Sequence, residues 1–273
     1  MNGSLRALTY GAAVGDALGV PFEFLYRGEF VCTDMVGEGS HHKPAGTFSD
    51  DTSMLLATAD SLRVNRGWVN IEDMRDRYKA WLFEGKYTAD GDVFDVGRAT
   101  YTALERGRGC TEERSNGNGS LMRIAPLACT RASDDDIRAV SAIKHAHRLS
   151  TESCVIFVHL LRFVMSGKSI EQFLTEVIVD EDFEFLKSIP SWSRDQVRSS
   201  GFVIATLGAA IWCALNTTDY RSCVLEAVNL GSDTDTTACV AGAWAAALYG
   251  YADIPKEWIE QLRGKDVIES CLF

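Results

Sequence analysis

Residues 5–19 read LRALTYGAAVGDALG, and this stretch carries the strongest helical periodicity of the chain. Its small and apolar residues at the i, i+3, i+4 spacing of one helix face are Leu5, Leu8, Ala12 and Gly15. Gly11, Gly15 and Gly19 lie four residues apart, although glycine is costly inside a helix. This register indicates close approach of another backbone or of a ligand, or tight helix packing alone.

Helical patterns continue along the rest of the chain. The further predicted helices cover about residues 49–65, 71–84, 96–106, 134–148, 152–165, 170–176, 201–215, 220–229, 235–249 and 257–262. Residues 20–48 and 107–123 are predicted as irregular connections, and residues 177–199 are mixed and polar. Alternating β-branched runs bounded by hairpin turns do not occur. We therefore predict an all-α fold, a compact orthogonal bundle of roughly ten or more helices in a single domain over residues 1–273.

Composition and net charge limit the kinds of molecule that the protein is expected to bind. The 273 residues are 46% hydrophobic and 24% charged, with a net charge of -11. These values are typical of a globular chain with a core of ordinary size. The net negative charge of the protein repels nucleic acid and anionic membranes, and no run of Lys or Arg forms a basic patch. We therefore expect no nucleic-acid or membrane partner, although a local pocket for a small phosphate is allowed.

The cysteines and the apolar runs indicate the compartment. Eight cysteines are present without a C-x-x-C pair, a pattern that favours free buried thiols over zinc or disulfides. The longest apolar runs, residues 154–165 and 201–215, are shorter than the roughly 20 residues of a membrane-spanning helix. The first residues lack the pattern of a signal peptide. These observations predict a cytoplasmic protein in a reducing compartment.

Two acidic clusters carry the most chemistry. Residues 46–54 read GTFSDDTSM, and residues 231–237 read GSDTDTT. Each cluster places two carboxylates and several hydroxyls just before an apolar helix. One interpretation is helix capping, because Ser, Asp and Thr satisfy the free N–H groups at helix starts. However, adjacent Asp50 and Asp51 exceed what one cap needs, and the same chemistry recurs about 180 residues later at Asp233 and Asp235.

These four carboxylates would repel one another if the fold brought them together, and a cation would relieve that repulsion. The donor set contains only oxygen, which favours Mg²⁺ or Mn²⁺ over zinc and leaves Ca²⁺ open. Four acids can support two metal ions, the number that allows a bridging hydroxide. The sequence therefore predicts a site for two divalent cations, held by Asp50, Asp51, Asp233 and Asp235, if the two clusters converge.

Two further segments are candidates for the site. Residues 15–23 read GDALGVPFE, which is either a glycine-rich helix end with a proline stop or a segment that places Glu23 beside a substrate. Asp16 would be costly if buried without partners, so it could orient the metal ligands. Residues 116–123 read NGNGSLMR, which is either an ordinary turn or a loop whose N–H groups hold phosphate. His145, by itself, is typical of a packed or surface histidine.

Taken together, these segments resemble the ADP-ribosylglycohydrolase family, including the dinitrogenase reductase-activating glycohydrolases. The resemblance covers nearly the whole chain, and its pieces occur in the family order. They are GDALGVPFE (15–23), GTFSDDTSM (46–54), NGSLMRIAP (118–126), His145 and NLGSDTDT (229–236). The ordered set is highly specific, whereas the first and third pieces alone would only be suggestive.

The resemblance implies an all-α enzyme with two divalent metals, usually Mg²⁺ or Mn²⁺. The metal ligands implied by motif are Ser49, Asp50, Asp51, Asp233, Asp235 and Thr236. The implied substrate-binding residues are Asn118, Gly119, Ser120 and His145. Glu23 matches a glutamate at the substrate mouth, and we expect proton transfer to involve Glu23 or one of the metal-bound aspartates Asp50 and Asp233.

The chain departs from the family pattern at three places. Ser49 stands where threonine is commoner, Ser232 follows Gly231 where a second glycine is frequent, and Phe202 stands where a tyrosine is often seen. A hydroxyl survives at Ser49, so metal binding should change little. We expect these differences to bear on the acceptor instead.

The resemblance implies hydrolysis of the glycosidic bond at the ribose C1″ carbon, which removes ADP-ribose from an acceptor. The substrate would be an ADP-ribosylated protein or a small ADP-ribose conjugate, with arginine as the first expected acceptor and serine as the second. Two alternatives remain open. One is a non-catalytic structural relative similar to lens crystallins, which loss of the carboxylates would favour. The other is a binuclear-metal hydrolase of another nucleotide or glycoside.

Overall fold

The computed structural model describes residues 2–273, with side chains from residue 4 onward. Within this range the secondary structure consists of helices, with three isolated β-bridges and no β-strand. The twelve α-helices of the described chain are α1 (Asn2–Gly19), α2 (Asp50–Val64), α3 (Ile71–Glu84), α4 (Arg98–Arg106), α5 (Asp134–Ala142), α6 (Arg148–Met165), α7 (Ile170–Glu176), α8 (Val203–Leu215), α9 (Tyr220–Val228), α10 (Thr234–Tyr249), α11 (Lys256–Gln261) and α12 (Lys265–Cys271). The prediction of an all-α bundle is confirmed.

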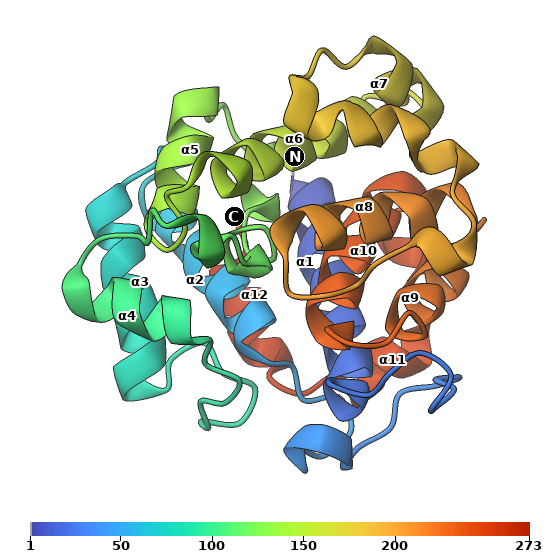
Figure 1. Cartoon of the computed structure of the whole chain (residues 1–273). Coiled ribbons are helices and arrows are strands. Elements are labelled where there is room, and N and C mark those ends of the chain that lie inside the picture. The colour runs from blue at the N-terminus through green and yellow to red at the C-terminus, as the bar shows by residue number, and fades with distance from the viewer. Residues whose placement is uncertain (1) are drawn as a thin grey trace.

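The centre of the bundle is the pair α1 and α10, which pack side by side along their length (Figure 1). The glycines of α1 allow this close approach. A Cβ atom on Gly11 would lie 2.4 Å from the carbonyl oxygen of Gly242, and one on Gly15 would lie 2.1 Å from that of Ala238. A Cβ atom on Gly19 would lie 2.4 Å from the backbone nitrogen of Asp235. The glycine register therefore reflects backbone approach, and it fixes the start of α10 against the end of α1.

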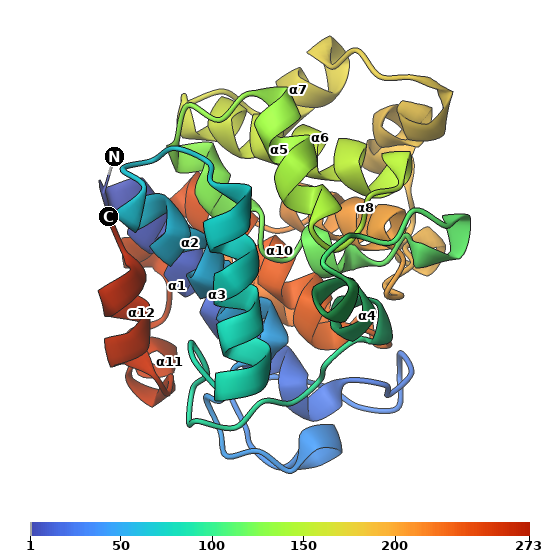
Figure 2. The same ribbon diagram turned by 90° about the vertical axis from the view of Figure 1, so that its left-hand side faces the viewer.

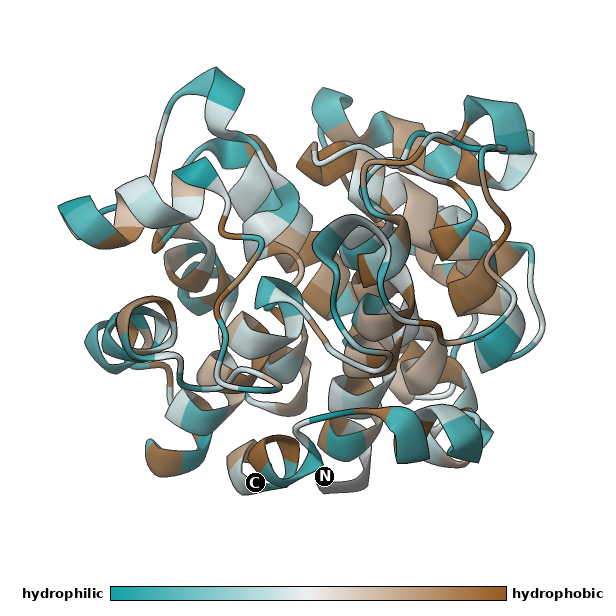
Figure 3. Cartoon of the chain, turned by 90° about the horizontal axis from the view of Figure 1, so that it is seen from below, coloured by the Kyte–Doolittle hydropathy of each residue, from teal (hydrophilic) through white to brown (hydrophobic). Residues whose placement is uncertain are grey.

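The other helices surround this pair. α8 and α9 lie against α10. α2 lies against α1, and α3 covers α2 (Figure 2). The peripheral helices alternate hydrophilic and hydrophobic residues along the ribbon, as expected for helices that bury one face (Figure 3). Trp81, Trp244 and Trp258 are fully buried and anchor α3, α10 and α11 to the core. None of the helices in the described chain is long and apolar enough to span a membrane.

The predicted helix over residues 134–148 is too long by several residues. α5 ends at Ala142, and α6 begins at Arg148 instead of about residue 152. The chain leaves the helix because Cys110 pairs with it: the Cys110 N–H donates to the Lys144 carbonyl, and the Ala146 N–H donates to the Cys110 carbonyl. This pairing is a contact between distant segments, which local periodicity does not report.

Two other segments differ in detail from the sequence prediction. Residues 177–199, predicted only as mixed and polar, contain a 3₁₀ segment over Glu181–Ser191 and a shorter one over Arg194–Gln196. α12 was not predicted, and it starts after Gly264, whose backbone is left-handed with φ 64°. All eight cysteines are free and six are buried, as expected from the sequence.

Candidate metal centre and active site

The first acidic cluster forms the start of α2. Ser49 is the N-cap residue, and its Oγ accepts a hydrogen bond from the Asp51 N–H at 3.2 Å. The serine alone therefore performs the capping, and the carboxylates of Asp50 and Asp51 are buried without serving as the cap. Capping explains Ser49 but does not explain the two buried acids beside it.

The second cluster forms the start of α10 and gives a similar result. Asp233 occupies the N-cap position, but its side chain accepts no capping hydrogen bond. Its carboxylate Oδ2 instead accepts a hydrogen bond from the Asn118 side-chain amide at 2.9 Å. Asp235 is fully buried in the first turn of α10. These acids also lie where helix capping does not require them.

The two clusters converge in space. Thr236 Oγ1 of α10 donates a hydrogen bond to Asp51 Oδ2 of α2 at 3.2 Å, and Ser49 Oγ donates to the same oxygen at 3.2 Å. The arrangement follows from the central packing, because α1 contacts both α2 and α10. The hydroxyls and carboxylates from residues 49–51 and 233–236 are thereby brought into one buried region.

Asp16 of α1 anchors the start of α2. Its carboxylate accepts hydrogen bonds from the Ser49 N–H at 3.0 Å, from the Thr52 N–H at 3.0 Å and from the Thr52 hydroxyl at 2.6 Å. Complete burial raises the pKa of Asp16 to about 6, although these hydrogen bonds oppose the rise. Asp16 thus positions the turn that presents Asp50 and Asp51, while its own oxygens are occupied by protein donors.

The aspartate oxygens provide the test of whether a cation fits. Asp51 Oδ1, Asp233 Oδ1 and Asp235 Oδ2 are buried, and each lacks a hydrogen-bond partner within the described chain. An unpaired buried carboxylate oxygen is expensive, so three of them in one region indicate a missing positive partner. An oxygen-only donor set of this kind suits a hard divalent ion. The residues present therefore fit the expected metal ions.

The pKa values of these aspartates also indicate a site for cations. Burial raises the pKa of Asp50, Asp51 and Asp235 well above the usual aspartate value, and the neighbouring carboxylates raise each further. The protein thus resists holding all these charges at once unless cations balance them.

Two residues that the sequence analysis missed belong to this region. Carboxylate oxygens of Asp50, Asp51 and Asp95 lie within 4.8 Å of one another, and a second group within that limit joins Glu23, His41, Asp95 and Asp235. Asp95 lies in the loop between α3 and α4, with a left-handed backbone at φ 55°. Burial, with Glu23 next in effect, raises its pKa to about 7.

A sequence signal for Asp95 existed but was weak, because the stretch GDVFDVG at residues 91–97 combines aspartates with glycines in a loop. His41 had no comparable signal in the irregular 20–48 segment. His41 Nε2 contacts the Glu23 carboxylate, and the Ser40 hydroxyl contacts the Glu23 carbonyl. These contacts with the turn Gly39–His41 (η2) hold the buried Glu23 near Asp95 and Asp235.

The structure places the predicted substrate loop directly beside the acids. Asn118 begins a 3₁₀ turn, Asn118–Ser120 (η4), and its side-chain amide bridges Asp233 and the Thr206 hydroxyl. Arg123 is fully buried and has no carboxylate partner among the described residues, and its Nε donates to the Gly119 carbonyl at 3.2 Å. The Ser120 hydroxyl faces the core, where it accepts a hydrogen bond from the Cys154 thiol.

Lys144 and His145 pack against this loop. The Lys144 side chain crosses Gly119 so closely that a Cβ there would lie 1.7 Å from Nζ. Burial lowers the pKa of Lys144, and the nearby Asp50 carboxylate opposes that fall. His145 is also buried and donates from Nδ1 to the Ser115 carbonyl, and burial lowers its pKa to about 3. His145 is therefore neutral and contacts the loop, and its contact with substrate stays a prediction.

Comparison with known proteins identifies the family. The ADP-ribosylglycohydrolase family model matches residues 4–272. ADP-ribosylarginine hydrolase Tri1 of Serratia proteamaculans is 34% identical over 92% of this chain and 73% of its own length. The ADP-ribosyl-[dinitrogen reductase] glycohydrolase of Rhodospirillum rubrum is 30% identical over 92% of this chain and 87% of its own.

Structural comparison agrees. A solved structure described as an ADP-ribosylglycohydrolase-related protein complex superposes with a TM-score of 0.81 at 30% identity, covering 99% of this chain and 96% of the other. Human ADP-ribosylhydrolase ARH3 is more distant, with 25% identity over 95% of this chain and 89% of its own. The chain therefore belongs to the ADP-ribosylglycohydrolase family and is a hydrolase of that family.

Proposed function

We propose that this enzyme cleaves the glycosidic bond between the ribose C1″ carbon of ADP-ribose and the side chain of an arginine acceptor, with two divalent cations. The observation that carries the proposal is the set of unpaired, buried carboxylate oxygens on Asp51, Asp233 and Asp235, in a chain of this family. The cations would be held by Ser49, Asp50, Asp51, Asp233, Asp235 and Thr236. Asp95 would join this set, because its carboxylate lies close to those of Asp50 and Asp51. When bound, Mg²⁺ or Mn²⁺ would polarise a water molecule and hold ribose hydroxyls.

The protein groups have separable roles in this proposal. Asn118 would position the substrate beside Asp233, because its amide already bonds that carboxylate. The backbone of Gly119 and Ser120 would hold the diphosphate, because the Ser120 side chain is engaged in the core. Glu23 would donate a proton to the leaving group, since burial raises the pKa of its carboxyl and keeps a proton there closer to neutral pH. Asp50 and Asp233 are the further proposed catalytic acids.

Two observations favour arginine as the acceptor. Aspartates gather in the site, Asp95 and Asp235 among them, and their negative charge would attract a guanidinium and not a neutral serine. The Serratia relative is also described as an ADP-ribosylarginine hydrolase. We further propose that the protein acts in the cytoplasm, on an ADP-ribosylated protein or a small ADP-ribose conjugate.

The test is release of free ADP-ribose from arginine-linked and serine-linked ADP-ribosyl peptides, with Mg²⁺, Mn²⁺ or EDTA. We expect metal-dependent release from the arginine peptide, which the pair Asp50→Asn and Asp233→Asn abolishes. Asp76→Asn, an exposed aspartate on α3, is the matched control and should retain activity. Release that persists in EDTA or in Asp233→Asn would contradict the metal assignment, and preferential release from the serine peptide would contradict the acceptor.

A further inference from the structure

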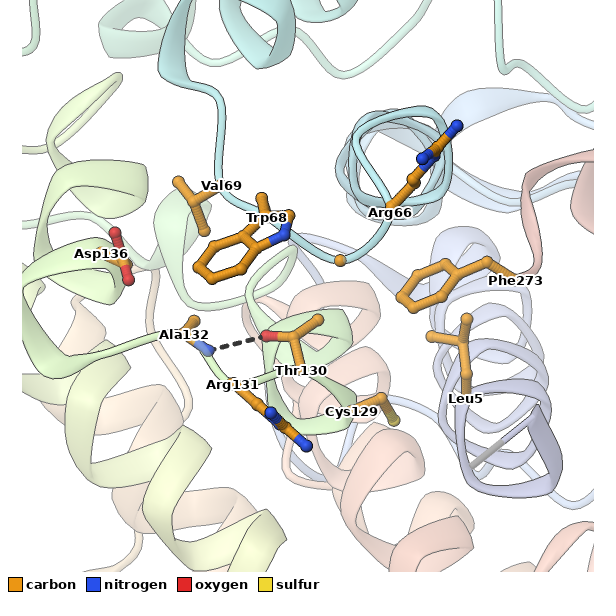
Figure 4. A pocket seen from close by; sticks show the side chains of 11 residues that line it. Leu5, Arg66, Trp68, Val69, Cys129, Thr130, Arg131, Ala132, Asp136 and Phe273 are labelled. Atoms are coloured by element: carbon orange, nitrogen blue, oxygen red, sulfur yellow. Dashed lines mark hydrogen bonds between the residues drawn. The ribbon is translucent and has the colours of Figure 1, made fainter.

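A cavity of about 430 Å³ (Figure 4) is lined by residues outside the two acidic clusters. Four parts of the chain line it: Leu5 at the start of α1, residues 66–69 after α2, residues 129–132, with Asp136 of α5, and Phe273 at the end of the chain. Its volume is within the range of pockets that hold small molecules, about 300–1,000 Å³. The fifteen residues of α2 separate it from Asp50 and Asp51, a distance of about 22 Å along the helix. A ligand here would leave the metal centre free.

Aromatic and apolar side chains form part of the cavity wall. The Trp68 and Phe273 rings lie on opposite sides of it, with Cys129 and Thr130 between them (Figure 4). Trp68 is 76% exposed, which is high for the largest apolar side chain. An indole left open beside a second ring and Leu5 offers stacking area to a planar molecule. The two rings therefore suit a ligand that contains a flat aromatic ring.

The charged side chains that line the cavity are two arginines and one aspartate, so their sum is positive. Arg66 and Arg131 are exposed and line it, and neither makes an ion pair or a side-chain hydrogen bond with the described part of the chain. The Asp136 carboxylate is already engaged, since it accepts hydrogen bonds from the Ser133 N–H at 2.9 Å and hydroxyl at 2.8 Å. In Figure 4 both guanidiniums point away from the space between Trp68 and Phe273, and they would have to turn toward it to hold an anion there.

We propose that this cavity is a second ligand site, which binds a small planar aromatic molecule carrying a carboxylate, sulfonate or phosphate group. The ring stacks between Trp68 and Phe273, and the anionic group is held by Arg66 and Arg131. Both guanidiniums sit on long side chains that no protein contact fixes, so they can turn toward the ligand. The site requires nothing from the metal centre, and its occupancy is independent of hydrolysis.

Fluorescence titration with 8-anilinonaphthalene-1-sulfonate tests the proposal, because this probe joins a planar aromatic body to an anion. We expect saturable binding of one probe per chain. Trp68→Ala should weaken binding at least tenfold, whereas Phe83→Ala, which removes an exposed ring on α3, should leave it unchanged. Because Trp68 is exposed, its truncation leaves the core intact, and far-ultraviolet circular dichroism checks this.

A second experiment tests whether the ligand must carry an anionic group. The double variant Arg66→Gln, Arg131→Gln should weaken binding of the sulfonate at least fivefold, but leave binding of the uncharged N-phenyl-1-naphthylamine unchanged. Sulfate alone should not bind, because it lacks the ring. Unaltered sulfonate binding in Trp68→Ala would overturn the proposal, as would equal weakening of both probes by the arginine changes. A wild-type dimer that Trp68→Ala dissociates in sedimentation would also overturn it, by assigning the cavity to a second copy of the chain.

Discussion

Gly15→Ala is the perturbation whose effect the structure defines best. Gly15 lies in the middle of α1, and a Cβ atom there would lie 2.1 Å from the carbonyl oxygen and 2.7 Å from the carbonyl carbon of Ala238. Both are backbone atoms of α10, so no side chain can rotate out of the way. The clash can be relieved only if α1 and α10 move apart along the central contact of the bundle.

The expected magnitude follows from two opposing effects. Alanine is favoured over glycine inside a helix by about 1 kcal/mol, which would stabilise α1. Overpacking a core with one methyl group costs about 1–3 kcal/mol, and more where a backbone must move. We expect the free energy of unfolding to fall by about 2–4 kcal/mol, since the obstructing atoms belong to a central helix. For a chain of this size, that corresponds to a melting temperature lower by about 4–16 °C.

Thermal unfolding followed by circular dichroism measures this change. Gly97→Ala is the matched control, because a Cβ there would meet only the Thr100 hydroxyl at 3.5 Å and its φ is -60°. The control should melt within a few degrees of the wild type. Because Asp235 is in the first turn of α10, Gly15→Ala should also weaken Mn²⁺ binding. A Gly15→Ala protein that melts at or above the wild-type temperature would refute the packing argument.

Three further predictions concern the site. Lys144→Met removes the buried lysine near Asp50, so that less positive charge opposes a bound metal ion. Calorimetry should show Mn²⁺ binding about tenfold tighter, which is about 1.4 kcal/mol. Unchanged affinity would contradict this prediction. Asp95→Asn should weaken Mn²⁺ binding at least tenfold, while Asp76→Asn does not, because Asp95 belongs to both carboxylate groups; equal affinities would exclude Asp95 as a ligand. Burial lowers the pKa of His145 in the folded protein to about 3, whereas an imidazole in the unfolded chain has a pKa of about 6.5. The unfolded chain therefore binds more protons between these values, and this histidine makes stability rise with pH by up to about 1.4 kcal/mol per pH unit. His145→Gln should remove that contribution from melting curves between pH 4 and 6.5, and an unaltered pH slope would argue against a neutral buried histidine.

Local chemistry determined most of the secondary structure. Helix periodicity and caps such as Ser49 and Ser133 depend on residues that are close together in the sequence. The starts of α2 and α5 could therefore be predicted from the sequence. The glycine register of α1 predicted close approach because no other residue leaves that space. The two acidic clusters were visible as excess carboxylates at helix starts. Their joint role depended on convergence, which the sequence could state only as a condition.

Tertiary contacts decided the remainder. The ends of α5 and α6 depend on the pairing of Cys110 with residues 144–146, and such a pairing between distant segments leaves no periodic signal. Asp95 and His41 join the site because the paths of two irregular loops bring them there, and loop paths are set by what the loops pack against.

The direction of each side chain was likewise outside the reach of the sequence. Ser120 faces the core, and His145 lies buried beneath the loop of residues 115–120. The sequence by itself determined which residue types were available to bind metal and substrate, because composition and spacing are local properties. Only the tertiary structure decided which carboxylate oxygens lack a partner, because burial and hydrogen bonding depend on the packing of α1, α2 and α10 against one another.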